Sequence, residues 1–253
     1  MWWRSSSVYA AAPASGSPSR DAWVSVVVPA LNEEAAIAQV VAAVPREVAR
    51  EVIVVDNGSG DATADRASGA GARVVREPHR GYGRACRTGA GAVDPACQII
   101  VFLDGDGSDR PELMAQLVAP IAAGRYDFVV GSRTRGLRER GSMSLSQLVA
   151  GRMIGFLVRW LYRVPYTDMC PFRAIRRDAL RRLAMREQTY GWNLEMQMRA
   201  AAAGLRILEV PVAHRRRAGG TSKVSGTVRG TVLAATRILV TFVRIACDRR
   251  ARA

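Results

Sequence analysis

Two aspartates separated by one glycine, Asp104-Gly105-Asp106, directly follow an apolar run of the chain. Carboxylates this close repel each other unless a proton or a cation lies between them. Mg²⁺ and Mn²⁺ take few oxygens from the protein and complete their coordination shell with phosphate oxygens of a substrate. We therefore predict that Asp104 and Asp106 bind a divalent cation and, through it, a diphosphate. An acidic turn that starts the next helix is the alternative, and we favour it for Asp109, as the cap, and for Glu112.

Polar residues also follow the first two apolar runs. Asn32 and Glu33 come after the first run, and Asp56 and Asn57 come after the second. In open α/β sheets ligands bind beyond the carboxyl ends of the strands, so we expect these residues beside the acidic pair. Asp56 is predicted to accept the imino N–H of uracil or guanine, because Asp61 is available to cap the following helix. A helix-capping turn is the alternative for Asp56.

A basic loop, HRRRAGGTSK (214–223), contains the single lysine of the chain, Lys223. Arg217, Ser222 and Lys223 offer hydrogen-bond donors that suit phosphate oxygens. Arg133 leaves the predicted strand 126–132 next to the acidic pair and is also expected to reach a phosphate. A solvated loop without a ligand is the alternative.

Alternating apolar strands and amphipathic helices must position these side chains. This alternation predicts one α/β domain with a doubly wound, mostly parallel sheet. The strands are expected at 24–30, 51–56, 72–77, 98–104, 126–132 and 205–212. The helices are expected at 32–44, 80–93, 111–124, 144–163, 190–204 and 225–250. Residues 1–22 are interpreted as a disordered leader, 23–224 as the domain, and 225–253 as a C-terminal amphipathic helix.

The composition limits the classes of protein. The 253 residues include 37 basic and 22 acidic side chains, a net charge of +15 that suits phosphate-rich partners. Aromatic residues make up 6% of the chain and do not alternate with basic ones, so a nucleic-acid partner is not expected and a nucleic-acid-binding protein ranks far behind the other hypotheses. The four cysteines are far apart and form no CxxC pair, which favours a reducing, cytoplasmic compartment.

Arginines are spaced along both long C-terminal helices. Arg229, Arg237 and Arg244 make a membrane span unfavourable. Their spacing of eight and seven places them along one helical stripe, and Arg152 and Arg159 repeat that spacing. Such helices suit an anionic membrane surface, with peripheral attachment at the cytoplasmic face. Packing on the domain with a solvated arginine face is the alternative.

Six motifs, taken in order, resemble the inverting family 2 glycosyltransferases of GT-A fold. They are VVVPALNEE, VIVVDNGSGDAT, LDGDGS, GSR, CPFRAI and RRRAGGTSK. The chain is most similar to the branch of dolichyl- or polyprenyl-phosphate sugar synthases, from about Trp23 to about Thr231. The chain departs from the family pattern at three places. Leu31 stands where many members have an aromatic residue, Asn57 replaces a second aspartate, and CPFRA replaces SGFRA.

The resemblance implies transfer of a hexose from a UDP- or GDP-sugar to polyprenyl or dolichyl phosphate, with Mg²⁺ or Mn²⁺ as cofactor. The metal is expected at Asp104 and Asp106. Donor contacts are expected at Pro29, Leu31, Glu33, Asp56, Asn57, Asp104, Gly105 and Asp106. Phosphate contacts are expected at Arg133, Arg217, Ser222 and Lys223, and catalytic roles at Asp106, Arg133 and Glu195.

The acceptor decides whether a general base is needed. A lipid monophosphate is already an anion, so positioning and desolvation supply most of the catalysis. A hydroxyl acceptor, on a soluble molecule or a glycan, needs a carboxylate base, and Glu195 in WNLEMQ is the candidate. A basic nucleic-acid-binding protein is the most distant hypothesis.

Overall fold

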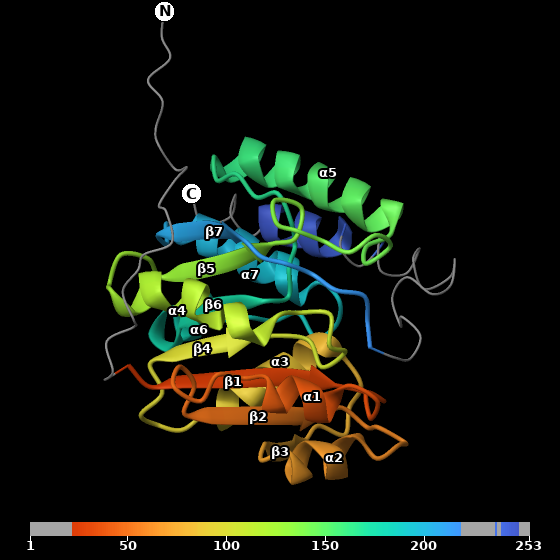
Figure 1. Ribbon diagram of the computed structural model, residues 1–253. Helices are drawn as coiled ribbons and strands as arrows, with labels where there is room; N and C mark the ends of the chain where they lie inside the picture. Colours follow the sequence, from red (N-terminus) through yellow and green to blue (C-terminus); the bar gives the residue numbers. More distant parts are fainter. Residues whose placement is uncertain (1–21, 219–235, 237–238, 248–253) are drawn as a thin grey trace, which may run out of the picture.

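A computed structural model describes residues 22–218, 236 and 239–247 of the chain (Figure 1). The predicted leader lies outside these residues except for Ala22, as do Ser222, Lys223 and most of the predicted C-terminal helix. In the described part a seven-stranded sheet has the order β3-β2-β1-β4-β6-β5-β7. Its strands are β1 (Val24–Ala30), β2 (Glu51–Asp56), β3 (Arg73–Arg76), β4 (Ile99–Phe102), β5 (Phe128–Ser132), β6 (Arg173–Arg176) and β7 (Ile207–Pro211).

The sheet is mixed, with β6 as its antiparallel strand. β6 runs antiparallel to its neighbours β4 and β5, whereas all other paired strands of the described sheet are parallel. β1 and β4 are buried along their whole length, as continuous apolar runs predict for strands covered on both faces. The predicted α/β class and mostly parallel sheet are therefore confirmed.

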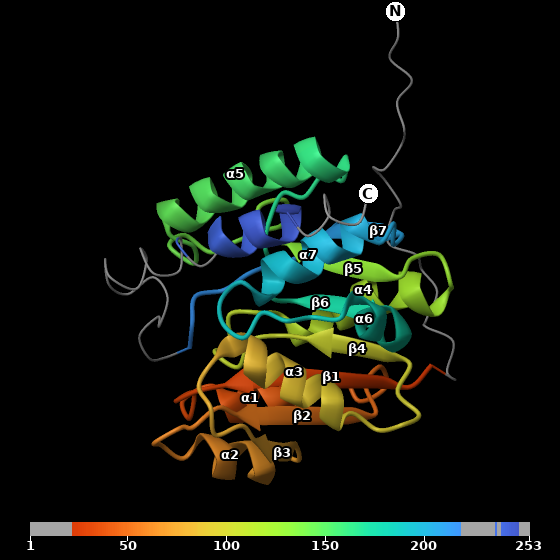
Figure 2. The same ribbon diagram turned by 180° about the vertical axis from the view of Figure 1, so that it is seen from behind.

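Helices cover both faces of the sheet, as the two opposite views show (Figures 1 and 2). α3 packs on β1 and β2, while α4 packs on β4, β5 and β6. Gly89 of α3 lies so close to Val27 that a Cβ atom there would clash with its side chain. The helices are α1 (Ile37–Ala42), α2 (Thr63–Gly69), α3 (Tyr82–Ala92), α4 (Met114–Ala122), α5 (Leu145–Tyr162), α6 (Arg177–Leu183) and α7 (Trp192–Ala202).

The predicted start of the first helix was wrong, and the helix predicted at 111–124 begins with a different geometry. α1 begins at Ile37 and not at residue 32, so its first turn contains no acidic residue. Asn32 has a φ of 51°, and Glu33 and Glu34 lie in the turn before the helix. The predicted helix 111–124 begins as a 3₁₀ turn, Pro111–Leu113, before α4 starts. Both α-helices therefore begin later than the sequence pattern indicates, after a turn or a 3₁₀ turn.

A short helix near the C-terminus, residues 239–247, lies between α5 and α7 in both views (Figures 1 and 2). Thr241 and Ile245 are buried, and the Thr241 hydroxyl donates to Glu187 Oε2 at 2.9 Å. Arg244 Nη2 lies 3.3 Å from the same oxygen. This C-terminal helix therefore packs on the domain through part of its surface, as the alternative interpretation predicted; Arg229 and Arg237 lie outside the described residues. Within the described residues, no helix has the length and hydropathy that a membrane span requires.

Candidate active site

The turn after β4 holds the acidic pair in a defined conformation. The Tyr82 hydroxyl donates to Asp104 Oδ1 at 3.1 Å, and the Asp104 backbone N–H donates to Asp109 Oδ2 at 3.0 Å. Asp106 Oδ1 accepts both the backbone N–H of Ser108, at 2.9 Å, and its hydroxyl, at 2.6 Å. Contacts from within the turn and from α3 thus orient both carboxylates before any ligand binds.

Asp109 is part of this acidic cluster, and the prediction that it caps the next helix was wrong. It is buried and bonds to the backbone of Asp104, while the 3₁₀ turn begins without a side-chain cap. Glu112 does lie in that first turn, as predicted. Asp109 thus stabilises the acidic turn itself and not the helix that follows.

Two carboxyls of this turn, Asp104 and Asp109, have raised pKa values. Desolvation, together with the negative charges of Asp106 and Asp109, raises the pKa of Asp104 well above its ordinary value. Burial raises the pKa of Asp109 to about 7. A bound cation would relieve this repulsion, so the residues present fit a divalent ion. In the described part of the chain no group of three or more His, Cys, Asp or Glu side chains is arranged to hold a metal, so such an ion would depend on ligand oxygens as well.

The basic loop reaches the acidic pair through Arg217. Its Nη2 lies 2.7 Å from Glu33 Oε1, and its Nη1 lies 3.3 Å from Asp106 Oδ2. The Ala218 backbone N–H donates to the Asp106 carbonyl at 3.1 Å, which fixes the end of the described loop over the turn. The structure thus brings together three predicted site residues that lie up to 184 positions apart.

Asp56 lies at the carboxyl end of β2, paired with Ala30 of β1. Its Oδ1 accepts the Ser59 backbone N–H at 3.0 Å, and the side chain is largely buried. Asp61 accepts the backbone N–H of Thr63, the first residue of α2, at 3.0 Å. Asp61 therefore supplies the contact to the start of α2 that the sequence predicted. A base contact through Asp56 stays a prediction.

Asn57 connects the β2 end to the loop that precedes α3. Its amide nitrogen donates to the carbonyls of Glu77 and His79, at 3.0 and 2.8 Å, and its oxygen accepts the Gly81 N–H at 2.7 Å. These bonds occupy the side chain on both sides. Direct donor contact by Asn57 stays a prediction, and its described contacts are those of a residue that fixes a loop.

The other residues predicted to contact the donor lie at the end of β1 and in the acidic turn, and their donor contacts stay predictions. Pro29 is buried within β1, and Leu31 is half-buried just beyond it. A Cβ atom at Gly105 would come within 3.3 Å of Ile37 Cδ1 and 3.4 Å of Val28 Cγ1. Gly105 therefore lets the acidic turn lie close against β1 and α1.

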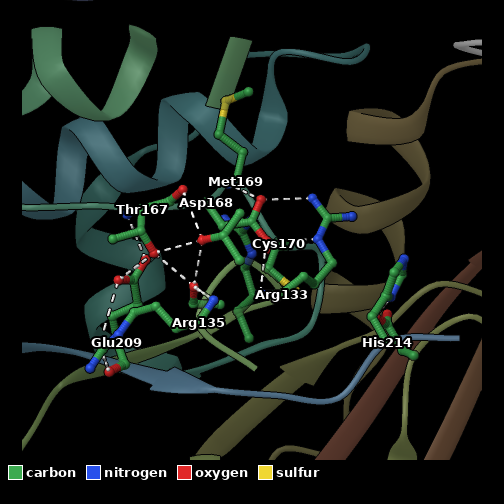
Figure 3. A network of polar contacts seen from close by, with 12 residues as sticks. Arg133, Arg135, Thr167, Asp168, Met169, Cys170, Glu209 and His214 are labelled. Atoms are coloured by element: carbon green, nitrogen blue, oxygen red, sulfur yellow. Dashed lines mark hydrogen bonds and ion pairs between the residues drawn. The ribbon is translucent and has the colours of Figure 1, made fainter. Parts of the chain in front are cut away.

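Arg133 is paired with Asp168, and its predicted contact with a phosphate stays a prediction. Its Nε and Nη2 donate to the two carboxylate oxygens of Asp168 at 2.7 and 2.8 Å, and its backbone N–H adds a third bond at 3.0 Å (Figure 3). Burial would lower the pKa of Arg133, but the Asp168 carboxylate raises it. The pair is nearly inaccessible to water, so Arg133 primarily fixes the β5 end.

His214 is a buried residue of this region that the sequence did not single out. Its Nδ1 lies 3.8 Å from Asp109 Oδ1 and has no hydrogen-bond partner within the described structure. Burial and the Arg133 charge lower its pKa to about 4. Figure 3 shows His214 apart from the Arg133–Asp168 contacts. In the sequence, only its position at the start of the basic loop indicated that His214 lies near the site.

Glu195 has the contacts of a structural residue. It is fully buried, and its Oε2 accepts the backbone N–H groups of Arg186 and Glu187 at 2.9 and 2.5 Å. Its Oε1 lies 2.9 Å from Arg199 Nε and 3.5 Å from Arg244 Nη2. Because both oxygens are occupied and shielded from solvent, the geometry argues against the predicted role of Glu195 as a general base.

Comparisons with known proteins agree on one family. The sequence profile of glycosyl transferase family 2 matches residues 25–184. An uncharacterized glycosyltransferase of Mycobacterium tuberculosis is 39% identical over 217 residues, which cover 83% of this chain and 94% of the relative. A dolichyl-phosphate hexose transferase of Haloferax volcanii is 34% identical over 202 residues, covering 78% of this chain and 85% of the relative.

Among solved structures, glucosyl-3-phosphoglycerate synthase from Mycobacterium tuberculosis in complex with Mn²⁺, UDP and glucosyl-3-phosphoglycerate is similar in fold. The TM-score is 0.71 at 24% identity, and the match covers 89% of this chain and 80% of the synthase. The predicted GT-A fold is confirmed by this likeness, and the predicted glycosyltransferase class by the family match.

Proposed function

The chain belongs to glycosyl transferase family 2, and on that premise we propose that it transfers a hexose from a UDP- or GDP-sugar to a polyprenyl or dolichyl phosphate. The observation that carries the proposal is the acidic pair after β4, half-buried Asp104 and buried Asp106, with Arg217 of the basic loop 3.3 Å from Asp106 Oδ2. Carboxylates and a guanidinium at one point suit a diphosphate and its counter-ion. Residues 23–224 form the catalytic domain in this proposal.

Asp104 and Asp106 would hold Mg²⁺ or Mn²⁺, which neutralises negative charge on the leaving nucleoside diphosphate. Tyr82 and Ser108 orient the two carboxylates through the hydrogen bonds described above. Arg217 is placed to exchange its carboxylate partners for phosphate oxygens of the donor. Ser222 and Lys223, farther along the same loop, are proposed to add phosphate contacts.

A phosphate acceptor is favoured by the state of Glu195. The two oxygens of this carboxylate are occupied by backbone N–H groups and arginines, so it is not available to deprotonate a hydroxyl. A lipid phosphate needs no base, because it attacks as an anion. The name of the Haloferax volcanii relative gives independent support for this class of acceptor.

Transfer to a hydroxyl of a soluble acceptor is the second candidate. The fold neighbour from Mycobacterium tuberculosis is a glucosyl-3-phosphoglycerate synthase, so this architecture accommodates a small phosphorylated acceptor in that protein. The two candidates differ in the need for a base: a hydroxyl acceptor needs a carboxylate such as Glu195 to deprotonate it, whereas a phosphate acceptor does not.

The test is a transfer assay with UDP- and GDP-hexoses, offering either a polyprenyl phosphate or 3-phosphoglycerate, with Mg²⁺ or Mn²⁺ and with EDTA. We expect a metal-dependent glycolipid product. Asp106→Asn should reduce turnover by about 100-fold or more, whereas Asp178→Asn, an exposed carboxylate on α6, should not. A product formed on 3-phosphoglycerate alone would overturn the acceptor, and full activity in EDTA would overturn the role of the acidic pair.

A lipid acceptor also requires access to a membrane. We therefore also propose that the enzyme is cytoplasmic and attaches peripherally to the cytoplasmic face of the membrane. This part is tested by vesicle binding and is independent of the choice of donor.

A further inference from the structure

One face of α5 carries a stripe of exposed apolar side chains. Val149, Met153, Phe156 and Trp160 each expose between 55% and 71% of their surface. Their spacing of four, three and four residues places them on one side of the helix, where neighbouring turns bring them together. Isolated exposed apolar residues are common, but a contiguous row with a phenylalanine and a tryptophan indicates a contact surface.

The packing of α5 prevents this stripe from turning inward. Ile154 and Val158, on the opposite side of the helix, are buried in the domain core. Gly155 approaches the Tyr166 backbone so closely that a Cβ atom would clash with the carbonyl oxygen. The stripe is thus displayed by a helix that already has its core-facing side filled.

Positive charge accompanies the stripe. Arg152 and Arg159 are exposed, and their spacing of seven places them in a row next to the apolar one. Arg163, also exposed, directly follows the end of the helix. Residues 145–163 contain no Asp or Glu. The adjacent C-terminal helix adds exposed Leu239, Val240 and Val243 and likewise has no acidic residue within 239–247.

We infer that this face of α5, with the exposed side of the C-terminal helix, binds the interfacial region of an anionic lipid bilayer. The apolar row would enter the boundary between head groups and acyl chains, the depth at which Trp160 is favoured. The arginine row would meet the anionic head groups. A second copy of the chain is a poorer partner, because pairing two such faces would bring arginines together without any acid from α5.

The test uses the purified full chain and vesicles of phosphatidylcholine, alone or mixed with phosphatidylglycerol, with no substrate present. We expect binding to the anionic vesicles that weakens as salt increases. The double substitution of Phe156→Ser and Trp160→Ser should reduce the partition coefficient by more than about tenfold. Arg152→Gln and Arg159→Gln should each reduce it by roughly fivefold at low salt.

A matched control removes the same charge elsewhere. Arg125→Gln and Arg181→Gln, at exposed positions after α4 and on α6, should change binding far less. Brominated lipids provide a second measurement, since they should quench tryptophan fluorescence in the wild type but much less in Trp160→Phe. Circular dichroism checks that the variants fold.

The outcomes separate the surface from the catalytic proposal. Unchanged binding by the stripe variants would overturn the inference, as would sedimentation showing dimers that those variants abolish. Transfer to a water-soluble short-chain polyprenyl phosphate should persist in the stripe variants. Loss of vesicle binding with retained transfer supports the docking face, whereas absence of transfer in the wild type counts against the proposed function only.

Discussion

The ion pair between Arg133 and Asp168 is the interaction whose removal gives the sharpest test of the structure. Asp168 accepts three hydrogen bonds from Arg133 and one from the Met169 backbone N–H, at 2.7 to 3.0 Å. Burial alone would raise the pKa of Asp168, yet Arg133 and these bonds lower it. Asp168→Asn keeps the shape of the side chain but removes its charge and one acceptor.

The expected loss follows from burial. The side chains of Arg133 and Asp168 expose 13% and 3% of their surface, so the substitution leaves a guanidinium without a counter-charge in a site nearly closed to water. Breaking a buried pair in this way typically lowers the free energy of unfolding by about 3–5 kcal/mol. For a chain of this size that corresponds to a decrease in Tm of roughly 6–20 °C.

Asp178→Asn is the matched control. Asp178 also contacts two arginines, Arg176 at 2.8 Å and Arg182 at 2.9 Å, but its side chain is 48% exposed. Solvent screening limits such pairs, so we expect a loss below about 1 kcal/mol. Urea unfolding of both variants measures the difference.

Equal, small losses in the two variants would refute the structural interpretation of the Arg133–Asp168 pair. A further variant separates charge from packing: Arg133→Met combined with Asp168→Leu replaces the pair with apolar side chains. It should recover most of the stability lost in Asp168→Asn, because no unpaired charge remains.

Three further predictions concern other parts of the molecule. Hydrogen bonds from Arg206 lower the pKa of Asp127 to about 2. The ionised Asp127 therefore stabilises the fold fully above its ordinary pKa near 4, and this contribution is lost as the pH falls toward 2. Asp127→Asn should remove about 1–2 kcal/mol of pH-dependent stability, measured by urea unfolding between pH 5 and 2. Gly83→Ala would drive a Cβ atom into the carbonyl of Glu187, and should lower stability by about 1–3 kcal/mol in thermal unfolding; an unchanged Tm would contradict that close approach. Arg217→Gln removes a cation from the acidic pair, so calorimetry should show roughly fivefold tighter binding of Mn²⁺ alone but about tenfold weaker binding of the nucleoside diphosphate; parallel changes in both affinities would count against the proposed exchange of partners.

The strands with uniform apolar runs were predictable from the sequence. β1 and β2 have the predicted bounds, Val24–Ala30 and Glu51–Asp56, because burial on both faces leaves a continuous β-branched pattern. β6 was not predicted. Its sequence RAIR begins with Arg173, which is fully buried in the centre of the sheet, and a buried arginine gives none of the apolar signal that marks such a strand.

The acidic pair was predictable for a similar reason, since a buried strand points it at a known binding edge of the fold. The partners of Arg133 and Arg217 were not predictable. Arg133 pairs with a residue 35 positions away, and Arg217 pairs with Glu33, 184 positions away. Residue type alone marks each arginine as a phosphate ligand, and only the tertiary arrangement shows which guanidinium already has a carboxylate.

The loop around Glu187 contacts both the C-terminal helix, part of the proposed membrane-binding face, and the helix that carries Tyr82 of the proposed active site. Its carboxylate is bonded to Thr241 of the C-terminal helix, while the next carbonyl, that of Gln188, accepts a backbone N–H from the first turn of α3. That turn carries Tyr82, which bonds to Asp104. The contacts of this loop thus join the C-terminal helix to the acidic turn, and a coupling between surface binding and donor binding would run through it. Such coupling is reciprocal: any tightening of donor binding caused by a surface must equal the tightening of surface binding caused by the donor.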